Sequence, residues 1–114
     1  MLENNHQLVY LYGISLRKFS QIENLMTILK EQITLGAKIR IILMHDGVIG
    51  ISKIGNTPSY ITELLNLPIK VYALKPDIKA RGIEIQELLD KIQLIEYDDL
   101  VDILVETPKI ISWL

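Results

Sequence analysis

The alternation of apolar and polar positions divides the chain into strand-like and helix-like segments. Five short runs rich in Ile, Leu, Val and Tyr have the length and composition of β-strands. Some are nearly continuous in apolar residues, which is typical of strands covered on both faces. We predict strands at 8–12, 39–44, 69–74, 93–96 and 110–113.

The first helix is predicted between the first two strands. Ser20 and Glu23 have the spacing of a capping box, in which each residue satisfies a free backbone N–H of the other. Apolar residues then recur every three or four positions, which predicts one buried helix face. Gly36 follows and provides a left-handed stop.

Four further helical segments are shorter. A cap at Thr57 with Pro58 in the first turn predicts one of them. A single turn is predicted at 78–81, and apolar spacing predicts another helix over 85–92. The last helix is predicted to begin at Asp98 and Asp99, because acidic side chains are favoured by the dipole at a helix N-terminus.

Strands and helices alternate along the whole chain, and the connections are too long for β-hairpins. This order predicts βαβ crossovers and a parallel sheet with helices on both faces. We predict an α/β fold, a three-layer α/β/α sandwich around a five-stranded parallel sheet. No repeat or linker interrupts the pattern, so we expect one domain over residues 1–114.

The amount of aliphatic surface changes this picture. Isoleucine, leucine and valine contribute 43 of the 114 residues (20, 18 and 5). This number exceeds what one small core with a polar exterior needs, so we expect an exposed apolar patch and an associating protein.

The charge balance argues against several classes of partner. With 12 basic and 14 acidic residues the net charge is -2, so there is no cationic excess for a nucleic-acid backbone. Charged residues interrupt every apolar run, and the first seven residues lack the pattern of a signal peptide. We expect a cytoplasmic protein with no direct nucleic-acid or membrane contact.

The sequence has no cysteine, which excludes disulfides, thiolate metal sites and a cysteine nucleophile in this chain. Its two histidines are too few for a zinc site without several carboxylates. Neither nucleotide-binding glycine fingerprint is present. We therefore expect no metal and no cofactor.

Ligands of parallel sheets bind beyond the carboxyl ends of the strands, here residues 13–17, 45–50 and 75–77. Ser15, His45 and Asp46 could be read as a hydrolase triad. Neighbouring residues on a strand point to opposite faces, however, so Asp46 is poorly placed to orient His45. A loop histidine and a turn aspartate are the favoured interpretation.

Residues 68–82, with the sequence PIKVYALKPDIKARG, closely resemble the central motif of the DsrH/TusB family. Three other segments agree in order: 43–48 (LMHDGV), 95–101 (IEYDDLV) and 111–114 (ISWL). The first 40 residues resemble the family only in their pattern of a strand, an apolar helix and a glycine turn.

The resemblance implies a single DsrE/DsrF/DsrH-like domain and a subunit without enzymatic activity. In the family's TusBCD and DsrEFH complexes, such a chain joins DsrE/TusD-like and DsrF/TusC-like paralogues in a persulfide relay. The relay serves 2-thiolation of the tRNA wobble uridine or sulfur oxidation. The sulfur-carrying cysteine lies on the DsrE/TusD-like chain. Some DsrH-type members also have a cysteine on the first helix, and residues 27–29 lack one here, which resembles TusB more.

The expected cleft or interface combines the top of the sheet with the last aromatic residue. In the alternative interpretation the chain is a homo-oligomeric small-molecule-binding protein or an unrecognised enzyme, and the same loops form its pocket. Trp113 is either an interface anchor or a cover for the sheet edge. The candidate residues are Asp46, Gly47, Lys75, Asp77, Lys79, Arg81 and Trp113.

Overall fold

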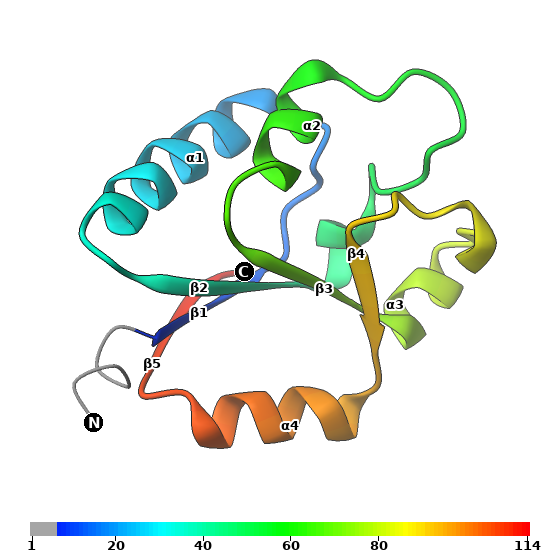
Figure 1. Cartoon of the computed structure of the whole chain (residues 1–114). Coiled ribbons are helices and arrows are strands. Elements are labelled where there is room, and N and C mark those ends of the chain that lie inside the picture. Colours follow the sequence, from blue (N-terminus) through cyan, green and yellow to red (C-terminus); the bar gives the residue numbers. More distant parts are fainter. Residues whose placement is uncertain (1–6) are drawn as a thin grey trace.

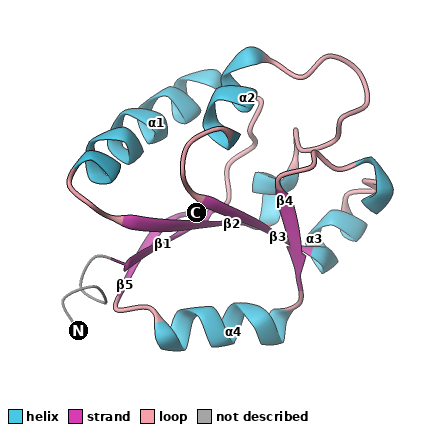
Figure 2. Cartoon of the chain, in the orientation of Figure 1, coloured by secondary structure: helices cyan, strands magenta, loops and turns pink. Residues whose placement is uncertain are grey.

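The five predicted strands form one all-parallel sheet in the computed structural model, which describes residues 7–114 (Figures 1 and 2). Each strand lies within one residue of its predicted bounds, so these predictions are confirmed. The strands are Gln7–Tyr12 (β1), Lys38–Leu43 (β2), Lys70–Leu74 (β3), Ile92–Ile95 (β4) and Lys109–Trp113 (β5).

The order of strands across the sheet is β4-β3-β2-β1-β5. From β1 to β4 the chain moves one strand at a time in one direction, with helices α1 (Phe19–Thr34) and α2 (Ser59–Leu65) on one face. Helix α4 (Tyr97–Glu106) then crosses the other face and returns the chain to β5 (Figure 1). The predicted three-layer α/β/α sandwich is confirmed.

Two separate apolar cores lie on the two faces of the sheet, because successive strand residues point to opposite sides. The larger core packs α1 and α2 against the sheet. The smaller core packs α4 against the other face. Its buried residues are Val9, Ile42, Leu74, Ile95, Leu100 and Ile103.

The start of α1 differs from the prediction. The helix begins at Phe19 after Lys18, which makes no side-chain cap, so a capping box at Ser20 and Glu23 is wrong. The carbonyl of Lys18 already accepts the N–H groups of Gln21 and Ile22, at 3.2 Å each, which places Ser20 inside the first turn. The loop before this helix is held by a long-range bond, in which the Leu16 N–H donates to the Ile49 carbonyl at 3.0 Å. The local spacing of Ser20 and Glu23 therefore does not decide where the helix begins.

The capping box of this structure belongs to α4. The backbone N–H of Glu96 donates to the carboxylate of Asp99 at 2.9 Å, and the Glu96 side chain accepts in return from the N–H of Asp99. Asp98 and Asp99 lie in the first turn, as predicted. At α2, in contrast, no side chain caps the helix, so the predicted cap at Thr57 is wrong.

The predicted helix over 85–92 is also wrong. Only Ile85–Glu87 forms a turn, of the 3₁₀ type. The following backbone pairs with a distant segment instead: the Leu89 N–H donates to the Ile51 carbonyl at 2.9 Å, and the Lys53 N–H donates to the Glu87 carbonyl at 2.7 Å. These long-range bonds take the backbone groups that an α-helix would have used, so the apolar residues of this segment pack against the core without forming an α-helix.

The single predicted turn at 78–81 is longer than expected. Helix α3 covers Lys75–Ala80 and begins directly after β3. Pro76 lies in its first turn, where a backbone N–H has no partner within the helix and its loss costs little. Gly82 follows with a φ of 68°, the left-handed conformation that ends the helix.

No helix within residues 7–114 has the combined length and apolarity that crossing a lipid bilayer requires.

Two tyrosines of β1 are buried in the larger core, and their hydroxyl groups differ in hydrogen bonding. The Tyr10 hydroxyl donates to the side-chain carbonyl of Gln32 at 2.6 Å. The Tyr12 hydroxyl has no hydrogen-bond partner among the described residues, and burial raises the pKa of Tyr12 to about 12. The ring of Trp113 packs near both, with centroid distances of 6.5 Å to Tyr10 and 6.0 Å to Tyr12.

The Tyr12→Phe variant should be more stable than the wild type by about 1 kcal/mol, because it removes a buried hydroxyl that forms no hydrogen bond. The matched variant Tyr10→Phe should be less stable by about 1 kcal/mol, because it leaves the Gln32 carbonyl without its donor. Urea unfolding followed by circular dichroism measures both. Equal effects of the two substitutions would contradict the assignment of the two hydroxyls.

Candidate functional site

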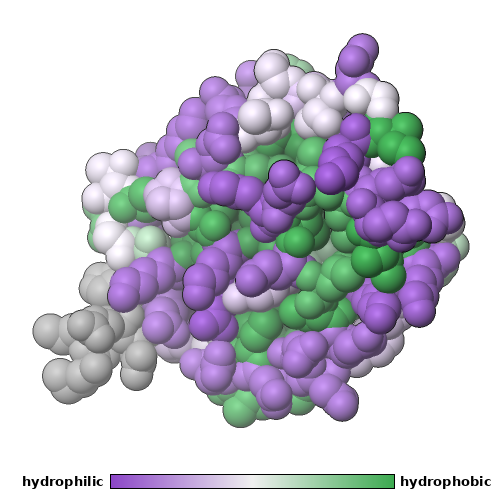
Figure 3. Space-filling model, turned by 45° about the vertical axis from the view of Figure 1, so that its right-hand side comes forward, coloured by the Kyte–Doolittle hydropathy of each residue, from purple (hydrophilic) through white to green (hydrophobic). Residues whose placement is uncertain are grey.

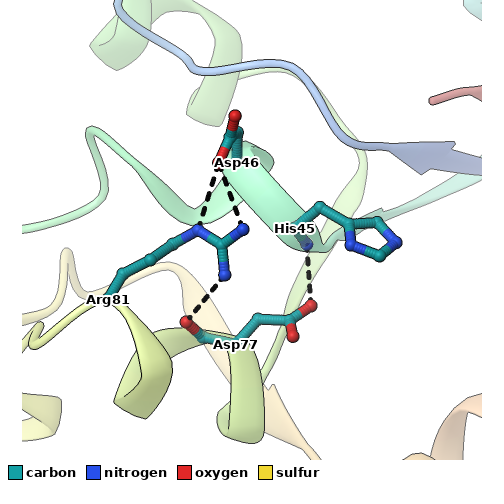
Figure 4. Close-up of polar contacts among 4 residues, drawn as sticks. All are labelled: His45, Asp46, Asp77 and Arg81. Carbon is teal, nitrogen blue, oxygen red and sulfur yellow. Dashed lines mark hydrogen bonds and ion pairs between the residues drawn. The ribbon is translucent and has the colours of Figure 1, made fainter.

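The carboxyl edge of the sheet brings polar side chains from two connections together. A 3₁₀ turn at His45–Val48, η2, follows β2, and α3 follows the neighbouring strand β3. Both elements start where their strands end, so the turn and the helix lie side by side at this edge. The predicted site residues Asp46, Asp77 and Arg81 meet here (Figure 4).

Arg81 holds the two connections together. Its Nε and Nη2 donate to Oδ1 of Asp46 at 3.3 and 3.1 Å, and its Nη1 donates to the backbone carbonyl of Asp77 at 3.4 Å. The Asp46 carboxylate is about two-thirds exposed, so this ion pair contributes little to stability, about 0.5 kcal/mol. Its effect is to fix the positions of η2 and α3 relative to each other.

Asp77 fixes the backbone of the turn. Its Oδ2 accepts the backbone N–H of His45 at 2.7 Å, a short bond to a charged acceptor. His45 has a φ of 53°, in the left-handed region that side chains other than glycine adopt at a cost. The carboxylate of Asp77 therefore helps to stabilise a strained residue at the start of η2.

The Ser15, His45 and Asp46 hypothesis for a hydrolase finds no support in these contacts. The Asp46 carboxylate binds Arg81, and the imidazole of His45 points away from both carboxylates (Figure 4). The Ser15 hydroxyl accepts the backbone N–H of Arg17 at 3.2 Å. His45 and Asp46 lie in a 3₁₀ turn and not on a strand, so the conclusion of the sequence argument holds for a different reason.

Gly47 packs the turn directly against the end of β1. A Cβ atom at this position would lie 2.2 Å from the carbonyl oxygen of Tyr12, so no other residue fits without a backbone shift. That carbonyl also accepts the N–H of Met44 at 3.0 Å. The glycine therefore permits the close approach of β1 and η2 on which this edge of the sheet depends.

The structure does not bring the other candidate residues into this group. The Lys75 ammonium lies 3.8 Å from the carboxylate of Glu96, towards α4. Lys79 is exposed and forms no ion pair within residues 7–114. Trp113 ends β5, which lies two strands away from β2, and packs its ring against the tyrosines of β1.

A cavity at the opposite edge of the sheet was not predicted from the sequence. This cavity of about 480 Å³ lies where the strands begin. Four basic residues line it: Lys38 and Lys70 start β2 and β3, Lys91 directly precedes β4, and Arg40 is the third residue of β2. Basic residues at the amino ends of successive strands were a visible signal, although the rule for parallel sheets directs attention to the carboxyl ends. Within residues 7–114 no cluster of His, Asp and Glu side chains is arranged to hold a metal ion.

Comparison with known families gives a match over most of the chain. A family model described as "DsrH like protein" matches residues 19–110. The chain belongs to the DsrH-like family. The resemblance of residues 68–82 to this family is thus confirmed, and the match also covers α1, where the sequence had shown only a similar pattern.

Curated relatives of this DsrH-family chain share more than a third of the aligned residues. It is 41% identical over 73 residues to "Protein TusB" of Escherichia coli (strain K12), covering 64% of this chain and 73% of that protein. It is 39% identical over 74 residues to "Protein TusB" of Photorhabdus laumondii, with the same coverage of each chain.

Solved structures agree with the fold. The ychN protein of E. coli superimposes with a TM-score of 0.73 at 20% identity, and the protein of unknown function MTH1491 from Methanobacterium thermoautotrophicum with 0.72 at 14%. Each comparison covers 94% of this chain and 98% of the other. At these identities the likeness concerns the fold alone.

The Gly47→Ala variant of this DsrH-family protein should lose about 2–3 kcal/mol of unfolding free energy, because its methyl group collides with a backbone carbonyl that cannot move alone. Gly13→Ala is the matched control. Its Cβ would meet the exposed side chain of Leu114 at 2.8 Å, which can turn away, so we expect a loss below about 1 kcal/mol. Similar losses in chemical denaturation of the two variants would show that the contact with Tyr12 is unimportant.

Proposed function

We propose that this chain is a single-domain, non-catalytic subunit of a cytoplasmic sulfur-relay assembly of the TusBCD or DsrEFH type. In this proposal it binds DsrE/TusD-like and DsrF/TusC-like paralogues, and the assembly serves tRNA wobble-uridine 2-thiolation or sulfur oxidation. The observation that carries the proposal is membership of the DsrH-like family in a chain of 114 residues without cysteine.

The absence of cysteine defines what this subunit contributes. Sulfur relays carry sulfane sulfur on a cysteine thiolate, and neither the thioether of methionine nor a hydroxyl replaces it. In the proposed assembly the thiolate comes from the DsrE/TusD-like chain. This chain contributes surface: it completes the assembly and shapes the approach to the partner's cysteine.

The outer side of α4 supports association with another subunit. Leu100 and Ile103 are buried against the sheet, whereas Val101 and Val105 are 55% and 81% exposed. Tyr97 is also exposed, and these three exposed residues recur every four positions and so share one face of the helix. An apolar helix face open to solvent is typical of a protein interface.

A groove beside the edge strand β4 supports the same conclusion. It measures about 390 Å³ and lies between β3, β4 and α4. Its lining is mixed: Tyr72, Leu94, Ile95 and Ile103 are joined by Gln93, Asp99 and Asp102. Figure 3 shows the side of the molecule on which β4 lies in Figure 1, and apolar surface runs there in a band between polar side chains. An edge strand beside a groove with both apolar and acidic lining residues favours a partner that covers it.

The carboxyl edge is the proposed polar part of the interface. Asp46, Gly47 and the segment 75–81 present carboxylates and cations on a turn and a helix held together by Arg81. Trp113 has a different proposed role. Its packing against Tyr10 and Tyr12 supports the interpretation that it covers the end of the sheet, with the remainder of its ring available to a partner.

The purified protein alone should accept no sulfane sulfur, because it offers no thiolate. Intact-mass spectrometry after incubation with a persulfide donor measures this, with the cysteine-containing DsrE-like paralogue from the same organism as the positive control. A stable mass increase of one or more sulfur atoms on this chain would contradict the non-catalytic role.

Co-expression with DsrE-like and DsrF-like chains of the same organism should yield a heteromeric complex in analytical ultracentrifugation. The Val105→Asp variant should weaken the complex about tenfold or more, since it places a charge within the apolar helix face. Ile28→Asp is the control, because Ile28 is exposed on α1, across the sheet.

A wild-type chain that binds neither paralogue would leave the subunit proposal without support. A homo-oligomer that binds a small molecule would then favour the alternative function.

A further inference from the structure

The cavity at the amino edge of the sheet concentrates positive charge. Four of the chain's 12 lysine and arginine residues line it, in a protein with a net charge of -2. Among residues 7–114, no aspartate and no glutamate belongs to the lining. The four cations are Lys38, Arg40, Lys70 and Lys91.

The register of the strands places these cations beside one another. Arg40 of β2 and Lys70 of β3 are direct partners across the sheet. Lys91 directly precedes Ile92, whose partner is Val71, so it continues the same row towards β4. Lys38 lies two residues before Arg40 and hence on the same face of the sheet. Like charges on adjacent strands repel each other and lower the stability of the sheet.

Among residues 7–114, an ion pair offsets the repulsion between these cations at Arg40 alone. The Arg40 guanidinium forms an ion pair with Glu106 at 3.0 Å. Within residues 7–114, no acidic group lies within 4.0 Å of the ammonium groups of Lys38, Lys70 and Lys91. The described part of the chain thus leaves three neighbouring cations without a counter-charge at a concave surface.

The walls of the cavity are suited to the body of an organic molecule. The connections before β2 and β3 contribute apolar side chains, including Ala37, Leu67 and Pro68. The side-chain amide of Gln7 adds a hydrogen-bonding group that can both donate and accept. A volume of about 480 Å³ lies in the range of small-molecule sites.

We propose that this cavity binds a small organic anion, with its phosphate or carboxylate groups at the lysines and its apolar body against the connections before β2 and β3. A nucleic-acid backbone is a poorer candidate, because it needs a longer row of cations on a chain that is acidic overall. The site lies at the edge opposite the Asp46–Arg81 pair and does not depend on the proposed relay function.

Two probes test the proposal on the full-length protein by isothermal titration calorimetry. Inorganic phosphate carries the anionic part alone, and adenosine monophosphate adds a sugar and a flat aromatic base to the same phosphate group. Adenosine monophosphate should bind more tightly than inorganic phosphate, and adenosine without phosphate should not bind. Raising the salt concentration should weaken the binding of both anions.

Lys70→Gln and Lys91→Gln should each lower the affinity for adenosine monophosphate about tenfold. Without ligand, the same variants should have unfolding midpoints about 1–4 °C above the wild type, because they reduce the repulsion between strands. Lys30→Gln makes the same change of charge on α1 and should alter neither property. A gain of stability coupled to a loss of binding distinguishes a ligand site from a structural cluster.

The proposal is overturned if neither anion binds the wild type at millimolar concentration, or if Lys30→Gln reduces binding as much as Lys70→Gln. Inorganic phosphate binding as tightly as adenosine monophosphate would overturn the assignment of the apolar wall and leave a simple anion site.

Discussion

A single helix has to carry the chain from one edge of the sheet to the other, and much of the surface of this protein follows from that constraint. The strands β4 and β5 lie at opposite edges, about 19 Å apart at the usual strand spacing. Helix α4 has ten residues and a length of about 15 Å, so it crosses the sheet and also forms the helical layer on that face. One helix cannot cover five strands, which leaves the groove beside β4 open and gives α4 two apolar sides.

The opposite face of the sheet is covered by more helices, and its apolar core is correspondingly larger. Helices α1 and α2 both pack there, and most of the largest buried side chains belong to that core. The carboxyl edge, in turn, is shaped by very short connections: α3 begins directly after β3, and only Met44 separates β2 from η2. Because parallel strands end together, the polar residues of both connections meet although 30 or more positions separate them in sequence.

The sequence predicts the helices and strands that depend on local composition. The prediction is wrong where hydrogen bonds to distant backbone groups determine the local structure. Short segments rich in Ile, Leu, Val and Tyr identify all five strands, although only some of these segments are nearly continuous in apolar residues. The segment 85–92 has the spacing of a helix, but its N–H and carbonyl groups pair with residues 51–53. Ser20 and Glu23 fit a capping box that the incoming loop makes unnecessary.

The same limit applies to the sites. The residues of the carboxyl edge can be named from the sequence, because the fold class says where parallel strands end. That Arg81 binds Asp46, and that Arg40 stands beside Lys70, depends on strand register, which hydrophobic patterning alone does not specify between distant strands. Gly47 is predictable in part. The sequence shows that it lies in an Asp-Gly turn, but its contact with Tyr12 depends on the tertiary structure.

The pairing of β1 with both β2 and β5 affects how the protein is made. Tyr12 is a register partner of both Leu43 and Trp113, so one side of β1 is paired early in synthesis and the other only after every other strand has been translated. Until then the nascent chain has an open strand edge on β1, which the finished sheet covers with β5. Two chains on neighbouring ribosomes offer each other the same edge, and exchange of β5 between them is the misfolding route that this topology favours.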